Sequence, residues 1–448
     1  MNLVYGIKDK PKFGQVVLFS IQQLLAIMAA TIAVPAVVGN GMTASAALFG
    51  AGVGTIVYLL FTKSSSPVFL GSSFAFLGSM FSAFGGAASV SIGYAGLIIG
   101  ALIAGLVYVV IAIVVKFCGV KWIDKLMPPV IIGPTVAIIG LSLAGNAVGD
   151  LMTSSVEGGS VYVCLICGLV TLAVVMLCST YAKKLGRLIP FIIGILAGYA
   201  CASIFAIIGA ITGNPAFTVI DYSPLTSMTS VVSLPEFSFL KADWSGMTGT
   251  YFLTVFVAYA PVAFVVFAEH LADHKNLSSI IGVDLLESPG LTRTLLGDGI
   301  GSAVGAFFGG CPNTTYGESI ACVAITRNAS TVSIWGAAIA CIIFSLITPL
   351  VCFLESIPNC VMGGVCFTLY GFIAASGFKM LQPVDLNKNR NLFVASVIFI
   401  TGVGGMVVTF GKVEIRTVAC ALILGILTNV MLSKEEDTEE DKPQQMIK

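Results

Sequence analysis

The stretch Gly-Cys-Pro-Asn-Thr-Thr-Tyr-Gly-Glu-Ser-Ile-Ala-Cys-Val-Ala-Ile-Thr-Arg, residues 310–327, decides the fold. Glu318 lies in its middle among small and apolar residues, and Pro312 and Gly317 predict that the backbone before it is not a plain helix. In a segment that lies within a membrane, a carboxylate beside an interrupted helix indicates a functional site. The alternative is a helix cap whose glutamate reaches water.

The composition indicates a membrane protein. Of 448 residues, 57% are hydrophobic and 10% are charged, and the mean hydropathy is +1.00, whereas soluble domains carry about 25% charged residues. The apolar runs are continuous over about 17 to 25 residues, as in spanning helices, and do not alternate as in an outer-membrane barrel. We therefore expect an all-α polytopic membrane protein.

The charge and cysteine patterns disfavour several other classes of protein. The net charge is zero and no long basic block is present, so nothing favours nucleic acid. The 12 cysteines lie almost wholly inside apolar runs, where we expect buried thiols and no metal site. The sequence contains no Walker A motif, nucleophile elbow or Asp-rich phosphate motif, so we expect neither an enzyme nor a bound cofactor.

Fourteen apolar segments are expected to cross the membrane. They fall at 15–38, 46–62, 68–85, 91–117, 127–149, 159–180, 187–211, 249–271, 291–311, 313–330, 331–353, 357–377, 392–410 and 414–433. With a cytoplasmic N-terminus, every Lys and Arg except Lys241, Lys412 and Arg416 falls on the inner side, as the positive-inside rule requires. Both termini are therefore expected in the cytoplasm.

A long connection at 212–248 divides the segments into two groups of seven, at 1–211 and 249–433, followed by a tail at 434–448. Because seven is odd, the second group runs in the opposite sense, and we expect an inverted repeat. Two matches support it: Ser72-Ser73-Phe74-Ala75 with Thr314-Thr315-Tyr316-Gly317 at an offset of 242, and Val130, Gly133, Gly140 and Ala144 with Val361, Gly364, Gly371 and Ala375 at an offset of 231.

The first of these matches predicts interrupted helices. Both stretches follow a proline, Pro67 or Pro312, and mix hydroxyl, aromatic and glycine residues that favour extended backbone. Non-helical backbone at membrane depth survives where it lines a cavity or is buried in protein. We expect segments three and ten to be short extended pieces followed by half-helices whose N-termini point into one polar pocket.

A second polar cluster is found at the end of segment eight. Glu269 and Asp273 are four residues apart and share a helix face, with His270 and His274 beside them, which suits a proton site. Hydropathy places the cluster near the cytoplasmic boundary, so the alternative is a polar helix end, above all for Asp273 and the two histidines. A metal site is not expected, because Glu269 is displaced from the face that the histidines share and no further ligand motif follows.

Together these motifs resemble the nucleobase-ascorbate transporter family, and within it the bacterial uracil permeases. They are Gln22, Leu-Gly-Ser-Ser-Phe-Ala-Phe at 70–76, Ala-Glu-His at 268–270, Pro-Asn-Thr-Thr-Tyr-Gly-Glu at 312–318 and Ala-Ile-Thr-Arg at 324–327, and they cover nearly the whole chain. The resemblance implies fourteen helices in two inverted repeats, in the bacterial inner membrane. It also implies a core domain of segments 1–4 and 8–11, which moves against a gate domain of segments 5–7 and 12–14 that forms a homodimer.

The resemblance further implies roles for individual residues. Phe74 would stack on a pyrimidine, Glu269 and Glu318 would accept its N–H groups, and the backbone at Tyr316 and Gly317 would bind its carbonyl oxygens. Ala30 and Tyr370 would complete the substrate site. Glu269, Asp273 and His270 would form the proton-coupling group, and the supporting residues would be Ser72, Ser73, Asp298, Thr315, Ser319 and Thr326. For Asp298, a structural role between helices is the alternative.

Three positions depart from the family pattern. Ser319 stands where Asn is usual and Ala321 where Gly is usual, which puts in doubt a hydrogen bond to the substrate or to the third segment. Asp273 stands where some uracil permeases have His.

From these features we expect a symporter that imports uracil with H⁺ by elevator-like alternating access. A xanthine or purine permease of the same fold and a nucleobase sensor that does not transport are the alternatives. An anion transporter of the related sulfate-permease type is disfavoured because the expected pocket is acidic.

Overall fold

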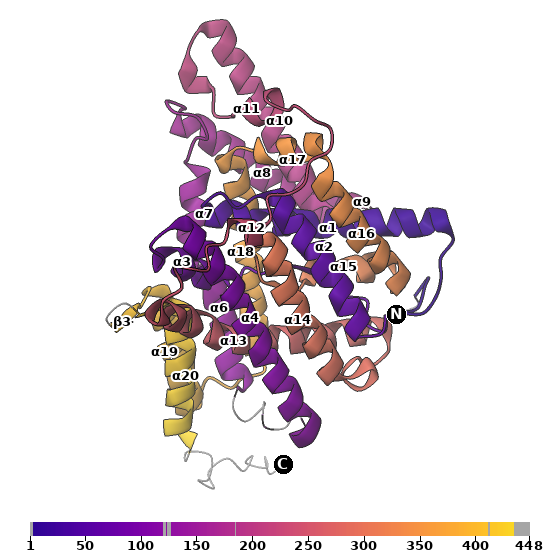
Figure 1. The fold of residues 1–448 in the computed structure, drawn as a ribbon, viewed down its shortest axis with the longest axis vertical. Coiled ribbons are helices and arrows are strands. Elements are labelled where there is room, and N and C mark those ends of the chain that lie inside the picture. Colours follow the sequence, from indigo (N-terminus) through magenta and orange to yellow (C-terminus); the bar gives the residue numbers. More distant parts are fainter. Residues whose placement is uncertain (1–2, 120–121, 123–126, 184, 411–412, 434–448) are drawn as a thin grey trace, which may run out of the picture.

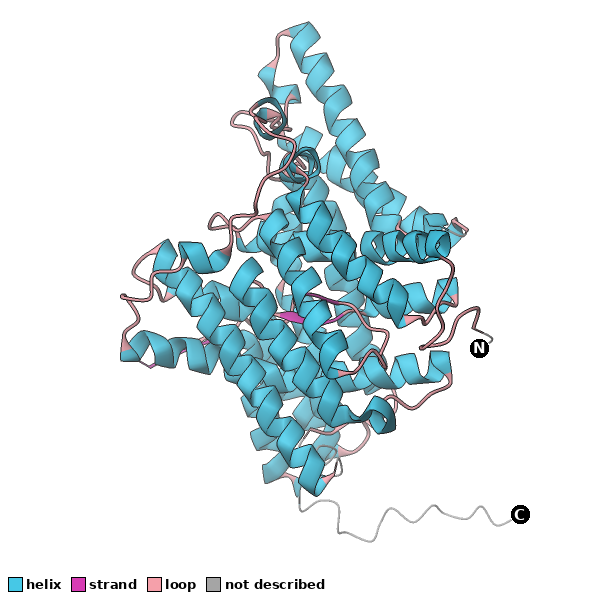
Figure 2. Ribbon diagram, turned by 45° about the vertical axis from the view of Figure 1, so that its right-hand side comes forward, coloured by secondary structure: helices cyan, strands magenta, loops and turns pink. Residues whose placement is uncertain are grey.

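The computed structural model describes residues 3–119, 122, 127–183, 185–410 and 413–433. It is mostly helical, with two pairs of short strands (Figures 1 and 2). Within the described residues, eight helices are long and apolar enough to cross a membrane, and four shorter apolar helices accompany them. The chain is therefore a multi-pass membrane protein in which several segments are not simple spanning helices.

The described residues of the first half contain ten regular elements. They are α1 (Phe13–Val38), α2 (Ala44–Phe61), β1 (Leu70–Ser72), α3 (Leu77–Gly85), α4 (Val90–Cys118), α6 (Pro129–Ser142), α7 (Ala144–Leu151), α8 (Val161–Tyr181), α9 (Leu185–Leu188) and α10 (Pro190–Thr212). Each expected segment of this half contains a helix, and the segment expected at 127–149 is divided into α6 and α7 at Leu143.

The remaining described elements belong to the connection and the second half. The connection holds η1 (Pro215–Phe217), α11 (Ser223–Thr226) and α12 (Ser238–Lys241). The second half holds α13 (Gly249–Ile281), η2 (Leu286–Gly290), α14 (Leu291–Gly309), β2 (Asn313–Thr315), α15 (Gly317–Thr326), α16 (Thr331–Leu346), α17 (Thr348–Glu355), α18 (Asn359–Leu381), α19 (Asn389–Val403), β3 (Val408–Phe410), β4 (Val413–Ile415) and α20 (Thr417–Met431). Pro349 near the start of α17 divides the segment expected at 331–353.

The end of α13 differs from the hydropathy pattern. The sequence predicts an apolar segment that ends near residue 271, but α13 is 33 residues long and ends at Ile281. His270 and His274 are fully buried, so they do not form a polar end at the membrane surface. Buried polar side chains lowered the hydropathy of this part of the helix, and the sequence pattern could not distinguish them from exposed ones.

The expected extended pieces in segments three and ten are confirmed as strands that pair with each other. β1 and β2 run antiparallel with Leu70 opposite Thr315, and both strands are wholly buried. Figure 2 shows this pair inside the layer of helices. Short half-helices follow, α3 of nine residues and α15 of ten. Two segments that are far apart in the sequence thus meet in the interior, where each satisfies backbone groups of the other.

The helices pack in two groups. In one, α2 packs on α14 and α16, and α4 packs on α13 and α14; in the other, α6 packs on α18 and α19, and α8 packs on α10 and α18. Glycines permit the closest approaches in both groups: a Cβ at Gly50 would lie 2.4 Å from the Gly305 carbonyl oxygen, and one at Gly140 would lie 2.2 Å from the Tyr370 carbonyl oxygen.

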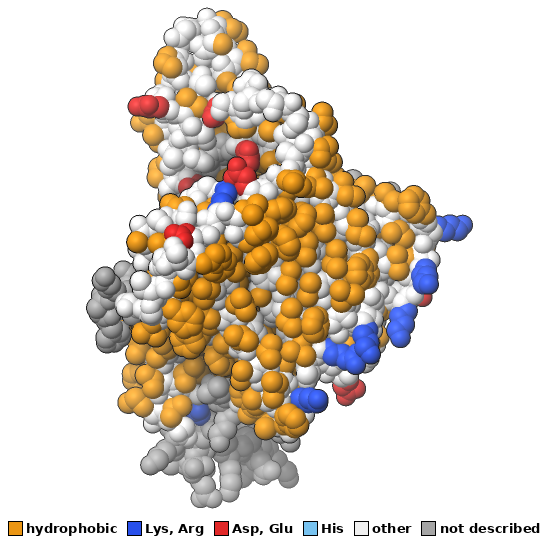
Figure 3. Space-filling model, in the orientation of Figure 1, with side chains coloured by type: hydrophobic (Ala, Val, Ile, Leu, Met, Phe, Trp, Pro, Cys, Tyr) orange, Lys and Arg blue, Asp and Glu red, His pale blue; other side chains and the backbone are white. Residues whose placement is uncertain are grey.

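The surface agrees with a membrane location. Figure 3 shows a broad apolar face, with most visible Lys and Arg side chains along its right and lower edge and most visible Asp and Glu side chains toward the opposite end. A wide apolar band between charged rims is what a bilayer requires.

Candidate functional site

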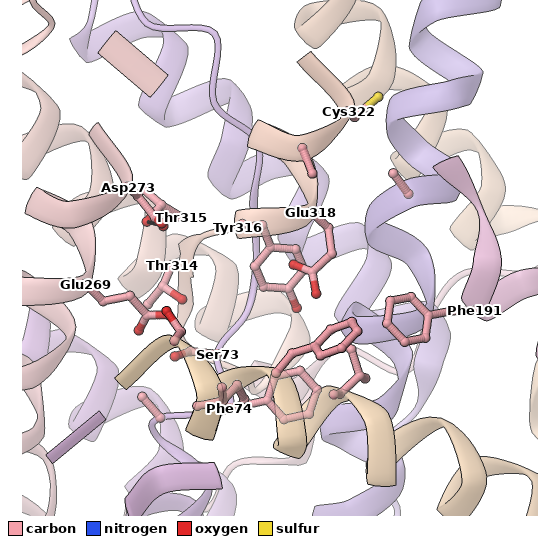
Figure 4. A pocket seen from close by; sticks show the side chains of 18 of the residues that line it. Ser73, Phe74, Phe191, Glu269, Asp273, Thr314, Thr315, Tyr316, Glu318 and Cys322 are labelled. Atoms are coloured by element: carbon pink, nitrogen blue, oxygen red, sulfur yellow. Dashed lines mark hydrogen bonds between the residues drawn. The ribbon is translucent and has the colours of Figure 1, made fainter. Parts of the chain in front are cut away.

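A cavity of about 400 Å³ lies where the two helix groups meet the β1–β2 pair. α13, β2, α15 and the residues that follow β1 line one side, and α6, α10 and α18 line the other. Figure 4 shows Phe74, Glu269 and Glu318 among the side chains around this space. Its volume is within the usual range for small-molecule sites, about 300–1,000 Å³.

Three carboxylates line the pocket. Glu269 and Asp273 come from α13, one helical turn apart on the same face, and Glu318 comes from the first turn of α15. Thr315 Oγ1 donates a hydrogen bond of 2.6 Å to Asp273 Oδ2, which links α13 to β2. The pocket therefore offers hydrogen-bond acceptors from two separate elements to one ligand.

The start of α15 offers donors to the same space. Tyr316 is the extended residue before the helix, and Gly317 is its first residue, so the amides of the first turn have no partner within the helix. A Cβ at Gly317 would meet nothing within 4 Å, so this backbone is open to the cavity. Amides at a helix N-terminus suit carbonyl oxygens as well as anions.

Aromatic rings cover another part of the pocket. Phe74 lines it, and Tyr370 of α18 packs edge-on against Phe74 with ring centroids 5.7 Å apart. Tyr316 is held by a 2.6 Å hydrogen bond from its hydroxyl to the Ser72 carbonyl oxygen. This bond crosses from one strand–helix unit to the other and fixes the ring beside the site.

Ser319 connects three segments behind the pocket. Its hydroxyl accepts hydrogen bonds from the Phe69 backbone N–H, at 3.1 Å, and from the Gln23 side-chain amide. The serine therefore bonds the third segment, the contact that the missing Asn amide had put in doubt. Ser319 is fully buried outside the pocket lining.

His270 faces away from the pocket. Its Nδ1 lies 2.6 Å from Asp298 Oδ2 and its Nε2 lies 3.0 Å from Thr294 Oγ1, both on α14. His274 stacks on His270 with ring centroids 4.0 Å apart, and its Nε2 lies 2.7 Å from the Tyr58 hydroxyl. These groups join α13 to α14 and α2, and His270 and Asp298 are not among the residues that line the pocket.

Some of the remaining predicted site residues line the pocket, and the others lie outside its lining. Ser73 and Thr315 line the pocket with Phe74, Tyr316 and Gly317. The residues outside the lining are Ala30, Ser72, Thr326 and Tyr370. Ala26, one turn before Ala30 on α1, lies in the lining where Ala30 was expected. Thr326 ends α15, where its hydroxyl donates to the Cys322 carbonyl oxygen at 2.7 Å.

Sequence analysis missed the wall formed by α6, α10 and α18. This wall includes Val136, Ile139, Phe191, Leu369, Phe372 and Ile373, and Arg187 of α9 also reaches the cavity. Apolar residues in apolar helices carry no local signal that separates a pocket wall from a lipid face. Only Pro190, which begins α10, marks this position in the sequence.

The chain is similar to known permeases over nearly its whole length. A sequence model of the permease family matches residues 14–411. The chain is 38% identical over 441 residues to the uracil permease of Bacillus caldolyticus, which covers 98% of this chain and 96% of the relative. It is 36% identical to the uracil permease of Bacillus subtilis strain 168, over 98% of each chain, and 36% identical to that of Escherichia coli K12, over 94% and 92%.

Solved transporters share the fold. The transmembrane domain of the cyanobacterial bicarbonate transporter BicA aligns with a TM-score of 0.61 and 16% identity, over 95% of this chain and 100% of that one. The murine anion transporter Slc26a9 in its inward-facing state aligns with a TM-score of 0.67 and 12% identity, over 96% of this chain and 69% of that one. At these identities the likeness concerns the fold alone.

Proposed function

Because the chain belongs to the permease family of nucleobase-ascorbate transporters, we propose that it imports uracil across the cytoplasmic membrane together with protons. As a permease it is a transporter and not an enzyme. The three relatives described above are named uracil permeases, which supports uracil as the substrate.

One observation carries the proposal: Glu269 and Glu318 approach the same cavity as Phe74 and the open backbone of Gly317. Uracil presents two N–H donors, two carbonyl acceptors and a flat ring. The carboxylates accept from the N–H groups, the α15 amides donate to a carbonyl oxygen, and Phe74 stacks on the ring. The site thus supplies a partner for each kind of group on the pyrimidine.

Glu269 is the proposed proton carrier. It faces the cavity from α13, one turn from Asp273, and two nearby carboxylates favour sharing a proton over both being ionised. A protonated Glu269 also gains a donor, so the binding of uracil and of the proton are linked, and this linkage is reciprocal. Each proton that enters supplies about 2.3 kcal/mol per 100 mV, enough for roughly 50-fold accumulation.

The two packing groups are the proposed moving parts. The group around α2, α4, α13, α14 and α16 corresponds to the core domain, and the group around α6, α8, α10, α18 and α19 corresponds to the gate domain. The cavity lies between them, which suits an elevator-like motion of core against gate. We further propose fourteen crossings in two inverted repeats, both termini in the cytoplasm, and a homodimer formed through the gate.

The test is uptake of labelled uracil into proteoliposomes with and without an inward proton gradient. The Glu269→Gln variant should lose gradient-driven accumulation and keep uracil exchange, because it keeps the shape of the site and loses the titrating group. Glu287→Gln, which changes an exposed carboxylate outside the pocket, should behave as wild type.

The same assay distinguishes the alternatives. Wild-type protein that binds uracil but accumulates none under any gradient would be a sensor. A cavity of about 400 Å³ is also large enough to justify xanthine as a second labelled substrate. Accumulation of xanthine without uracil would make the protein a purine permease.

A further inference from the structure

The two walls of the pocket have opposite chemistry. The wall from α13, β2 and α15 carries Glu269, Asp273, Thr314, Thr315 and Glu318. The facing wall from α6, α10 and α18 is mostly apolar, with Ser376 its polar member on α18, and Ser179 of α8 and Arg187 of α9 also line the cavity. Figure 4 shows Phe191 on the side of the pocket opposite Glu269 and Asp273. A ligand held between these walls must present one polar edge and one apolar edge.

Uracil has these two edges. Its N1, C2, N3 and C4 positions carry every N–H and carbonyl group, whereas C5 and C6 carry only C–H bonds. Unpaired polar groups are costly in a buried site, so the polar edge belongs on the acidic wall. The C5–C6 edge then points toward the apolar wall, and any substituent at C5 meets the side chains of that wall first.

Phe191 and Phe372 form the aromatic part of the apolar wall. Their rings pack edge to face with centroids 6.3 Å apart, and they join α10 to α18. Phe191 is buried, and it follows Pro190 in the first turn of α10, where the proline limits the backbone. Because the Phe191 ring is buried and packed, it forms a firm boundary of the cavity, whereas Phe372 is about half exposed.

We propose that Phe191, supported by Phe372, forms the subsite for a substituent at C5 of the pyrimidine and determines which 5-substituted uracils the protein accepts. This inference rests on the proposed function. An aromatic wall favours a methyl group or a halogen at C5 over a charged group, which would lose its hydration against the rings. The inhibition constants of thymine and 5-bromouracil should lie within about tenfold of the value for uracil.

The experiment measures competition by uracil, thymine and 5-bromouracil against labelled uracil, for wild type, Phe191→Ala and Phe191→Trp. The quantity compared is the ratio of the inhibition constants of 5-bromouracil and uracil within each variant. In Phe191→Ala the ratio should fall at least tenfold, because the smaller side chain leaves space for the bromine. In Phe191→Trp it should rise at least tenfold, because the larger ring fills that space. Phe205→Ala removes a ring from the same helix outside the pocket and should keep the wild-type ratio.

Each outcome separates this inference from the proposed function. Ratios equal to wild type in both Phe191 variants, with uracil still transported, would overturn the C5 subsite and leave uracil transport intact. If the alanine variant does not fold, Phe191→Leu replaces it, because leucine keeps an apolar side chain and still removes the ring edge; an unchanged ratio there would also overturn the subsite. Wild-type protein that neither binds nor transports uracil would overturn both proposals.

Discussion

The two strand–half-helix units, β1–α3 and β2–α15, share one plan and carry different chemistry. In the second unit a single residue, Tyr316, separates the strand from the helix, so the first-turn amides and Glu318 lie at the pocket. In the first unit the four residues 73–76 separate strand from helix, and this turn brings Ser73 and Phe74 to the pocket while α3 begins beyond it. One unit therefore supplies charge and amides, and the other supplies an aromatic surface.

The largest expected effect tests the charge of the second unit. Glu318→Gln keeps the shape of the side chain but loses a charged acceptor, and hydrogen bonds to charged groups are worth about 1.5–3 kcal/mol. We expect the KM for uracil to rise about 10- to 100-fold, measured as initial uptake in proteoliposomes. The residue that corresponds to Glu318 at the offset of 242 is Phe76, a buried ring stacked on Tyr259.

Phe76→Leu is therefore the matched change in the first unit. It should lower the thermal unfolding temperature by a few degrees, because the ring packs in the core. It should change the KM for uracil much less than Glu318→Gln does. A KM that rises equally in both variants would contradict the division of chemistry between the units.

A second prediction concerns the close contact between the units. A Cβ at Gly71 would lie 2.4 Å from the Tyr316 ring, so Gly71→Ala must displace the ring that is bonded to the Ser72 carbonyl oxygen. Overpacking of this kind costs about 1–3 kcal/mol, and we expect a lower unfolding temperature and roughly tenfold weaker uracil binding by calorimetry. Gly78→Ala on α3, where a Cβ meets nothing within 4 Å, is the control and should be neutral or slightly stabilising. If Gly71→Ala and Gly78→Ala have the same unfolding temperature and the same affinity for uracil, the close contact at Gly71 is not needed for stability or binding.

This comparison also shows which parts of the molecule its sequence predicts. The strand–half-helix units were predictable because proline, glycine and hydroxyl residues are conspicuous between apolar runs, and Glu269 and Glu318 were predictable because charge inside such runs is expensive. The side to which His270 points depends on the packing of α14, which no local pattern records. Phe191 was missed because a phenylalanine in an apolar helix has the same local appearance whether it faces lipid, core or pocket.

The smallest expected difference concerns two hydroxyl residues that correspond at the offset of 242, Ser73 and Thr315. Both residues line the pocket. The Thr315 hydroxyl donates a hydrogen bond of 2.6 Å to Asp273. Ser73 instead contacts the other unit through its backbone N–H, which donates to the Pro312 carbonyl oxygen at 2.9 Å. Thr315→Val removes a hydrogen bond to a carboxylate and should raise the KM for uracil roughly tenfold. Ser73→Ala keeps its backbone bond and should raise it by less than about threefold.

A double-mutant cycle makes this last comparison specific. If Thr315 acts through Asp273, the KM for uracil of the double variant Thr315→Val, Asp273→Asn should be little higher than that of Asp273→Asn alone. The reason is that Asp273→Asn already changes the hydrogen bond between the two residues. If the free-energy effects of the two single substitutions on the KM add in the double variant, the threonine hydroxyl acts directly on the ligand. If Ser73→Ala and Thr315→Val raise the KM for uracil equally, the hydroxyl residues of the two units contribute alike to binding. The difference between the units would then lie only in Glu318 and Phe74.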